Sequence, residues 1–381
     1  MTDEREFLRF LFDAAVAAAS PAACMPLWLE DRPKGRVLVV GAGKAAASMA
    51  AIVEQQWAPP LSGLVIVPYG HGVECENIEV VEAAHPVPDD HGVAATRRIL
   101  ELVSNLGEGD TVLCLLSGGG SSLLCAPADG VTLAEKQAAT KALLRSGAPI
   151  QEINARRREL SAVKGGKLAA ACAPANVITL IISDVPGNDP SVVASGPTIV
   201  DATSARDSDV RILATSDDAL QAAALRALER DINPYLLGDL AGDAREIAEE
   251  HAKLALDIAA GAGPVEAPCV ILSGGETTVH VTGTGRGGRN SEYGLALALA
   301  LDGHPGISAI ACDTDGIDGA GDNAGVFVLP DSLARTADDA GAMQANNDSY
   351  AFFGRLGDLV MTGPTRTNVN DFRAILVRSG G

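Results

Sequence analysis

The strongest constraint on the fold is a unit that recurs along the first half of the chain. Each unit is a short apolar run, a polar or glycine-rich loop, and then a stretch with helical periodicity. The expected strands are residues 36–40, 63–67, 78–82, 111–116 and 177–183. Strands that alternate with helices predict a parallel sheet covered by helices on both faces. A first amphipathic helix is expected over residues 5–19, where apolar side chains recur at helical spacing.

A second strand-rich region follows residues 201–264, an acidic stretch that we expect to be mostly helical. Its expected strands are residues 269–272, 277–281, 307–312, 325–328, 359–361 and 375–377, and its helices lie near 289–301, 331–340 and 348–356. A chain of 381 residues has room for two domains. We therefore predict an α/β chain with an N-terminal domain at 1–240, a helical connection at 241–264 and a C-terminal domain at 265–381.

The charge balance excludes several kinds of partner. The 29 Lys and Arg against 49 Asp and Glu give a net charge of −20, which repels nucleic acid and anionic membranes. An anionic substrate would need a local basic cluster. No run of about 18 apolar residues could span a membrane. The seven cysteines show no CxxC spacing, and the N-terminus does not read as a signal peptide, so a cytoplasmic protein with reduced thiols is expected.

A glycine loop follows the first strand and opens a helix. Gly41, Gly43 and Lys44 fit the loose dinucleotide pattern GxGxx(G/A). Two features argue against NAD: Lys44 stands where the backbone should approach the pyrophosphate, and Val67 leads into Pro68 rather than into an acid that could hold a ribose. What remains is an anion site at a helix N-terminus that carries a lysine. The alternative is a tight turn with a solvated lysine.

A second glycine loop follows the strand at 111–116. Three glycines let backbone approach a ligand, and the flanking serines add hydroxyl donors, so we predict a phosphate cradle here. The loop does not match the nucleophile-elbow pattern GxSxG, because Leu123 stands where the last glycine is required. A flexible turn is the alternative. The residues of this loop are Ser117, Gly118, Gly119, Gly120, Ser121 and Ser122.

Further polar residues are candidates for the same site. Residues 154–167 hold five positive charges beside a glycine pair, from which we assign Lys164 to phosphate binding and Arg157 to substrate binding. A solvated helix face is the alternative for this basic run. Asp184 ends another strand, where it could hold Mg²⁺ or accept a proton, or only turn the chain before a proline.

The second half contains an arginine at an expected helix start. Arg289 would lie beside unbonded N–H groups, where a guanidinium suits phosphate or carboxylate. We assign Asn290 and Glu292, in the same turn, to substrate binding. Asp315 lies in an acidic loop, residues 313–319, that could hold a metal or simply turn the chain. The sequence contains no HxxxH pair and no Cys/His cluster, so we do not expect a zinc site.

Taken together, these motifs resemble the glycerate 2-kinases whose C-terminal part is called the MOFRL domain. The matching segments include VGAGKAA at 40–46, YGHG at 69–72, AAHPVPD at 83–89, LLSGGGSSL at 115–123, KGGKLA at 164–169, ISDVPGNDPSVVASGPT at 182–198, LSGGETTVHVTGTGRGGRNSE at 272–292, DTDGIDG at 313–319, NDSY at 347–350 and TGPTRTNVND at 362–371. They follow the family order and span nearly the whole chain.

The resemblance implies transfer of the ATP γ-phosphate to the 2-hydroxyl of D-glycerate, with Mg²⁺, giving 2-phosphoglycerate and ADP. It implies a large Rossmann-like N-terminal domain, a smaller mixed α/β C-terminal domain, and an active site in the cleft between them. The family's important lysine and arginine fall on Lys44 and Arg289. Our hypothesis is that Lys44 contacts a transferring phosphate oxygen and that Arg289 steadies developing charge or the glycerate carboxylate. Asp184 or Asp315 would hold Mg²⁺ or accept the hydroxyl proton.

Two other functions stay open. One is an NAD(P)H-dependent hydroxypyruvate or tartronate-semialdehyde reductase, and the other is a sugar-acid sensor without catalysis. The expected partners are small molecules, and the expected state is a monomer or a homodimer.

Overall fold

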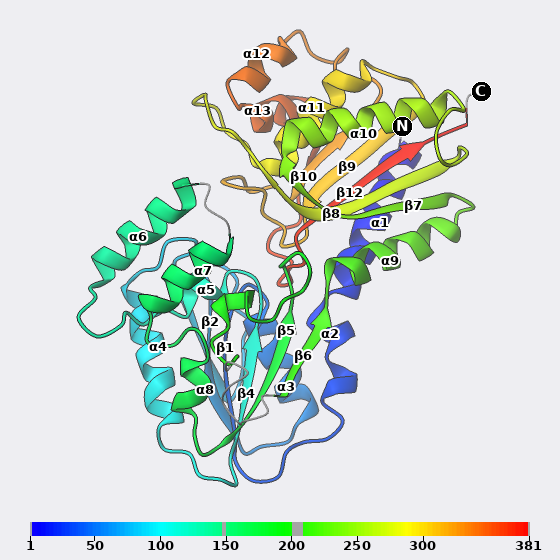
Figure 1. Ribbon diagram of the computed structural model, residues 1–381. Coiled ribbons are helices and arrows are strands. Elements are labelled where there is room, and N and C mark those ends of the chain that lie inside the picture. The colour runs from blue at the N-terminus through cyan, green and yellow to red at the C-terminus, as the bar shows by residue number, and fades with distance from the viewer. Residues whose placement is uncertain (1, 147–149, 200–208, 380–381) are drawn as a thin grey trace. The chain divides into compact units, whose positions relative to one another are not determined.

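The computed structural model describes residues 2–146, 150–199 and 209–379 (Figure 1). Residues 147–149 and 201–208, parts of two stretches expected to be largely helical, lie outside the described residues. The chain forms two compact units. The first, called here the parallel unit, comprises Ser20–Thr215 and Arg366–Asn368. The second, the mixed unit, comprises Met1–Ala19, Ser216–Thr365 and Val369–Gly381.

The parallel unit is built on the predicted parallel sheet, whose six strands have the order β3-β2-β1-β4-β5-β6. Every neighbouring pair in it is parallel. The strands are β1 (Val37–Ala42), β2 (Leu61–Pro68), β3 (Ile78–Ala83), β4 (Thr111–Leu116), β5 (Asn176–Ile182) and β6 (Asp209–Ala214). The helices are α2 (Pro21–Cys24), η1 (Pro26–Trp28), α3 (Ala46–Gln56), α4 (Asp90–Val103), α5 (Gly120–Leu123), α6 (Leu133–Ser146), α7 (Ile150–Glu159), α8 (Lys167–Ala171) and η2 (Val193–Ser195).

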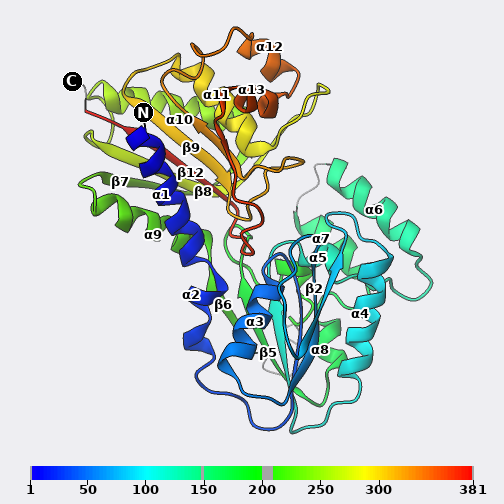
Figure 2. The same ribbon diagram turned by 180° about the vertical axis from the view of Figure 1, so that it is seen from behind.

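Helices cover both faces of this sheet, as Figures 1 and 2 show. Successive side chains of a strand point to opposite faces. Leu38 and Val40 of β1 therefore share one apolar core with Ile99 of α4 and Leu168 of α8. Helix α3 packs on the strands from the other face. The predicted Rossmann-like architecture is thus confirmed for this part of the chain.

The mixed unit contains a second six-stranded sheet, with the order β11-β10-β9-β12-β8-β7. Only β7 and β8 pair in parallel, and the other neighbours are antiparallel. The strands are β7 (Asn233–Asp243), β8 (Cys269–Thr278), β9 (Ile307–Asp313), β10 (Gly325–Val328), β11 (Leu359–Val360) and β12 (Asp371–Val377). The helices are α1 (Thr2–Ala18), α9 (Ser216–Leu228), α10 (Ala244–Ala259), α11 (Arg289–Leu301), α12 (Ala340–Ala345) and α13 (Ser349–Leu356).

The structure divides the chain differently from the predicted boundary at residues 241–264. Helix α10 packs against α11 in the core of the mixed unit, so it is not a free connection. Strand β7 lies beside β8, where mostly helix was expected. Helices α1 and α9 cover the opposite face of the same sheet (Figure 2). The first helix of the chain thus belongs to the unit formed by its second half.

The interior is aliphatic and contains no disulfide among the described residues. All seven cysteines lie in the described part of the chain, none of them forms a disulfide, and five are buried. Burial raises the pKa of the Cys172 thiol to about 12, which keeps this group protonated at neutral pH. Among the described residues, no helix is both long and apolar enough to cross a membrane.

Candidate functional site

The two predicted glycine loops of the parallel unit lie next to each other at the carboxyl edge of its sheet. Strand β1 is hydrogen-bonded to β2 on one side and to β4 on the other. The strand order reverses at this point, and open α/β sheets bind ligands at such a switch point. The loop after β1 carries Lys44, which is half-buried, and the loop after β4 is Ser117–Ser122.

The N–H groups of the turn between β1 and α3 are already used inside the protein. Their bonds are Gly43 N to Ile66 O (3.1 Å), Lys44 N to Gly118 O (2.9 Å), Ala45 N to Ser117 Oγ (2.9 Å) and Ala46 N to Gly43 O (3.1 Å). The phosphate-binding role of Gly41 and Gly43 stays a prediction, and the bonded N–H groups of residues 43–46 do not favour it. Gly41 lies within β1, where a Cβ would collide with the Leu115 carbonyl of β4. A contact between this turn and a phosphate would therefore come from the side chain of Lys44, which is half-buried.

The loop after β4 keeps backbone donors for a ligand. Among the described residues, none accepts a hydrogen bond from the N–H of Gly118 or of Gly119. Gly119 has φ +81°, which only glycine adopts without strain. Gly120 donates to the Ser117 carbonyl (3.2 Å), and Ser122 Oγ donates to the Gly119 carbonyl (3.1 Å), so the turn is closed by its own residues. Successive N–H groups in such a turn form a concave anion-binding nest.

Three polar side chains crowd this glycine loop. A Cβ on Gly118 would collide with Asp184 and Asn368, and a Cβ on Gly119 would lie 2.9 Å from His85 Cδ2. Asn368 Nδ2 donates to Asp184 Oδ2 over 3.0 Å. Sequence reasoning missed Asn368, which reaches the parallel unit through the three residues Arg366–Asn368. Its place in the motif at 362–371 was the only signal.

The two aspartates predicted as metal ligands have different surroundings. Asp184 is half-buried beside the glycine loop, whereas Asp315 is buried in the mixed unit and its Oδ1 accepts from Ile317 N over 2.7 Å. Asp315 thus stabilises its own turn. The described residues contain no group of three or more His, Cys, Asp or Glu side chains arranged to hold a metal ion. Mg²⁺ sites often use only one or two carboxylates together with substrate phosphates, and Asp184 suits that pattern.

The predicted basic residues Arg157 and Lys164 line one small cavity beside Ser121 and Ser122. Lys164 is buried, and its ammonium donates to the carbonyl and to the hydroxyl of Ser121. Ser121 Oγ also lies 2.9 Å from Ser195 Oγ. A third cation, Lys136 of α6, lines the same cavity, and sequence reasoning missed it. The sequence feature that could have indicated Lys136 is its spacing from Thr140, because residues four apart lie on one face of a helix. Both side chains are buried in the structure.

In the mixed unit, Arg289 is held by carboxylates on two strands. Its Nη2 lies 2.7 Å from Asp313 of β9, and its Nε lies 2.8 Å from Asp371 of β12. Glu276 approaches Nη1 at 3.7 Å. Burial opposes the charge, yet Asp313, Asp371 and Glu276 hold the pKa of Arg289 well above its ordinary value. The guanidinium is therefore a fixed, permanent cation with part of its surface still exposed.

The start of helix α11 is occupied, contrary to the prediction of unbonded N–H groups there. Asp318 accepts from Asn290 N (2.9 Å) and from Ser291 N (2.8 Å), and Ser291 Oγ donates to it as well. Burial raises the pKa of Asp318, although these three bonds favour its carboxylate form. This carboxylate caps the helix and complements its dipole.

The substrate roles predicted for Asn290 and Glu292 conflict with their positions. Asn290 is fully buried, and its Nδ2 donates to Asp371 (2.7 Å). The Glu292 carboxylate is also buried and pairs with Arg245 at 2.5 Å. Burial raises the pKa of Glu292 despite this ion pair. Both side chains hold α11 in place within the mixed unit, because buried polar groups need partners there.

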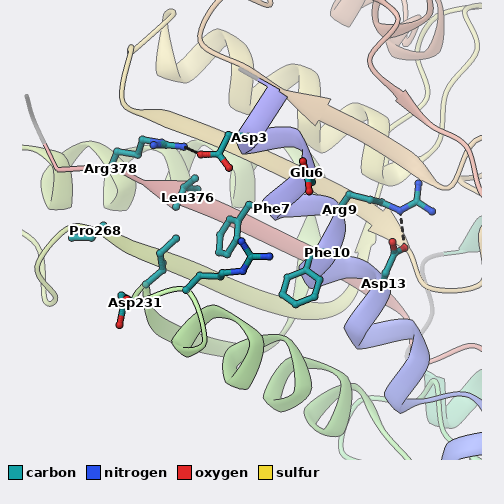
Figure 3. A pocket seen from close by; sticks show the side chains of 12 residues that line it. Asp3, Glu6, Phe7, Arg9, Phe10, Asp13, Asp231, Pro268, Leu376 and Arg378 are labelled. Atoms are coloured by element: carbon teal, nitrogen blue, oxygen red, sulfur yellow. Dashed lines mark hydrogen bonds and ion pairs between the residues drawn. The ribbon is translucent and has the colours of Figure 1, made fainter.

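A broader pocket in the mixed unit contains none of the predicted site residues. Figure 3 shows it along α1, with Phe7 facing Leu376 of β12. Its charged groups are mixed in sign, and Arg9 pairs with Asp13 at 2.6 Å. The residues with chemistry typical of phosphate handling lie elsewhere, at the glycine loops and around Arg289.

Comparison with known proteins assigns the chain to a family. Residues 7–229 match the family described as domain of unknown function DUF4147, and residues 269–371 match the MOFRL family. A protein of Agrobacterium vitis whose name proposes a hydroxypyruvate reductase is 48% identical over 98% of this chain and 94% of its own. The D-glycerate 2-kinase of Thermotoga maritima is 39% identical over 88% of this chain and 89% of its own.

A solved structure has the same fold. The crystal structure of glycerate kinase from Thermotoga maritima matches with a TM-score of 0.89 at 35% sequence identity, covering 99% of this chain and 100% of that chain. Sequence and fold agree over both units, from the glycine loops of the parallel unit to the strands that hold Arg289. The chain belongs to the MOFRL family of glycerate kinases.

Proposed function

We propose that this protein is a kinase that transfers the γ-phosphate of ATP to the 2-hydroxyl of D-glycerate, giving 2-phosphoglycerate and ADP. Relatives named as glycerate kinases match both units of the chain, and one of them is named as a D-glycerate 2-kinase. The position of transfer rests on that name. We propose a cytoplasmic enzyme, monomeric or homodimeric, with Mg²⁺ as the metal.

The observation that favours a kinase over a reductase is the hydrogen bonding of the first βα turn. A dinucleotide of the Rossmann type places its pyrophosphate on N–H groups of that turn. Here the N–H groups of residues 43–46 are bonded to Ile66, Gly118, Ser117 and Gly43. A lysine at the turn and open N–H groups at Gly118 and Gly119 instead suit phosphate oxygens.

The roles of the residues follow from what phosphoryl transfer requires. The protein contributes mainly positioning and neutralisation of charge. Lys44 would contact an oxygen of the transferring phosphate, and the N–H groups of Gly118 and Gly119 would bind others. Arg289, in the mixed unit, would steady developing charge or the carboxylate of the acid. The Arg289 guanidinium is held by Asp313 and Asp371, which lowers the reorganisation needed during reaction.

Asp184 is the residue that would hold Mg²⁺ or take the hydroxyl proton. Its carboxylate lies beside the glycine loop, and Asn368 fixes one of its oxygens. Mg²⁺, when bound, would neutralise charge on the nucleotide phosphates. Asp315 remains a weaker second candidate, because its Oδ1 already accepts from Ile317 N.

The test is an assay of the purified full-length protein with D-glycerate, ATP and Mg²⁺. Enolase converts 2-phosphoglycerate to phosphoenolpyruvate, which absorbs in the ultraviolet, so product is followed without NADH. Formation of 2-phosphoglycerate supports the proposal. Formation of 3-phosphoglycerate, identified by phosphorus NMR, would keep the kinase and overturn the position. Oxidation of NADH by hydroxypyruvate without ADP formation would replace the kinase by the reductase that relatives from Agrobacterium vitis are named for.

A further inference from the structure

A small cavity beside the second glycine loop has an unusual lining. Three cations face it from separate segments: Lys136 of α6, Arg157 of α7 and Lys164 of the loop before α8. Three hydroxyl side chains also line the cavity, those of Ser121, Ser122 and Thr140. The remaining lining residues are two prolines, an alanine and a leucine. No acidic side chain is among the lining residues that the structure describes.

The two lysines are buried without a carboxylate partner in the described part of the chain. Lys136 is 5% exposed and Lys164 is 1% exposed. Lys136 Nζ donates to the carbonyls of Ala126 (3.3 Å) and Leu160 (3.4 Å), and Lys164 Nζ donates to Ser121. Buried lysines are almost always paired with a charge of opposite sign, because desolvation of a lone ammonium is costly.

The nearest acidic residues along the same helices bond elsewhere. Glu135 accepts from Thr132 N and Oγ1, each at 2.8 Å, in the first turn of α6. Glu159 pairs with Arg156 at 2.7 Å on the exposed side of α7. Burial lowers the pKa of Lys136 and of Arg157, and burial together with the charges of Lys136 and Arg157 lowers the pKa of Lys164 well below its ordinary value. Among the side chains that the structure describes, the cavity has no negative charge that would stabilise all three cations.

We propose that this cavity binds one small oxyanion of the reactants, a carboxylate or a phosphoryl group, between Lys136, Arg157 and Lys164. Arg157 offers a planar fork of N–H donors, which suits both kinds of oxyanion. The Ser121 hydroxyl adds a further polar group, whereas the Ser122 hydroxyl already donates to the Gly119 carbonyl. This inference rests on the proposed function for the identity of the ligand, while its geometry is independent of Lys44 and Arg289.

The test is calorimetric binding to the full-length protein, without turnover. The ligands are D-glycerate alone, and a non-hydrolysable ATP analogue with Mg²⁺ alone. The variants are Lys136→Met and Arg157→Gln, which remove a charge but keep most of the side-chain volume. The matched controls are Lys141→Met, an exposed lysine of α6, and Arg156→Gln, the exposed neighbour of Arg157. Circular dichroism would establish that each variant is folded.

We expect both cavity variants to weaken binding of one ligand at least tenfold and both controls to change it less than twofold. Loss of glycerate binding would identify the carboxylate as the ligand, and loss of analogue binding would identify a phosphoryl group. Wild-type affinity of Lys136→Met and Arg157→Gln for both ligands would overturn the inference, as would the absence of any binding to the wild type.

Failure of the cavity proposal can be distinguished from failure of the kinase proposal. If the protein forms ADP but the cavity variants bind both reactants normally, the kinase stands and this site is wrong. If no ADP forms but the variants lose glycerate binding, the site stands and the kinase is wrong. Thermal unfolding adds a second readout, because the bound ligand should raise the Tm of the wild type and of the controls more than that of the cavity variants.

Discussion

The structure restricts which atoms of Lys44 could contact a phosphate. The backbone of its turn is bonded to the neighbouring loop, so any contact with phosphate must come from the side chain. The glycine pattern in the sequence predicted the turn correctly, but it could not show that the N–H groups of the turn are bonded within the protein. Residue spacing shows where a loop lies, whereas the partners of each N–H group depend on which strand becomes its neighbour.

We expect Lys44→Ala to lower kcat by about 10²–10³-fold, because one well-placed charge on a transferring group is worth that much. The fold should survive, since the turn is held by backbone bonds. The measurement is steady-state kinetics with D-glycerate and ATP. Lys44→Arg serves as the control that keeps the charge and should lose less. Near-normal turnover of Lys44→Ala would exclude a direct role for this side chain.

Asp313 is expected to act by positioning Arg289. Asp313→Asn should lower kcat by about tenfold, because an amide holds Nη2 less firmly than a carboxylate does at 2.7 Å. The effect should appear in kcat/KM for glycerate while far-UV circular dichroism is unchanged.

A double-mutant cycle separates this positioning role from general loss of stability. In the background of Arg289→Lys, the further change Asp313→Asn should have little additional effect, because the fork it orients is gone. Additive losses in the double variant would mean that Asp313 acts on something other than Arg289.

Helix α11 shows how a carboxylate from another segment helps to fix an element of the site region. Asp318 lies in the acidic loop at 313–319, which the sequence suggested as a metal loop or a turn. In the structure it caps the first turn of α11 through two N–H groups and one hydroxyl. The site depends on this cap because Arg289 is the first residue of the helix.

Asp318→Asn should destabilise the mixed unit by about 1–2 kcal/mol, the usual cost of losing a helix cap. An amide can accept at one oxygen but turns its NH₂ group toward the other N–H donors. Chemical denaturation followed by circular dichroism measures the change. Asp322→Asn is the control, since Asp322 is exposed in the same loop region. Equal stability of both variants and the wild type would show that the cap contributes nothing.

Elements were predictable from the sequence where their hydrophobic pattern was uninterrupted. Helix α11 begins and ends at the expected residues, and the five strands expected in the first half are present. Strand β7 was missed because Pro234 and Gly238 read as breaks. It is the edge strand of its sheet, where proline is tolerated. Strand β8 was expected as two strands, but Gly274 and Gly275 lie within one continuous strand of ten residues.

The candidate site was predictable in its loops and not in its assembly. Ser117–Ser122, Asp184 and Arg157 were predicted as site residues from residue type and spacing, and these assignments stay predictions. Lys136 and Asn368 were not, because one lies on an ordinary-looking helix and the other reaches the parallel unit from far along the chain. Asn290 and Glu292 were assigned to substrate because polar residues near a motif look functional, whereas the structure uses them to satisfy buried partners.

For the whole molecule, the two units should respond differently to acid. His251 of the mixed unit is buried, and its Nδ1 lies 2.7 Å from Tyr293 Oη. Burial, together with the charge of Arg373, lowers its pKa to about 4. In the unfolded chain the pKa returns to its ordinary value near 6.5. Between these values the unfolded state binds more protons, so stability of the mixed unit falls as pH falls, by at most about 3 kcal/mol from this residue.

This acid sensitivity can be measured unit by unit. Both tryptophans, Trp28 and Trp57, belong to the parallel unit, so tryptophan emission follows that unit, while far-UV circular dichroism follows both. As pH falls from 6.5 to 4, we expect the circular dichroism transition to move to lower denaturant before the emission transition does. His251→Gln should flatten that dependence. A dependence unchanged in His251→Gln would assign the sensitivity to other groups.

The division of the chain between its two units has a consequence for biosynthesis. Helix α1 is translated before the main segment of the parallel unit, yet its partners α9, β9 and β12 are translated only after that segment. At usual rates of translation the nascent helix waits on the order of tens of seconds. During that time its apolar side chains, among them Leu8, Leu11 and Phe12, have no native surface to cover them. Helix α1 is therefore open to chaperones and proteases during that part of synthesis.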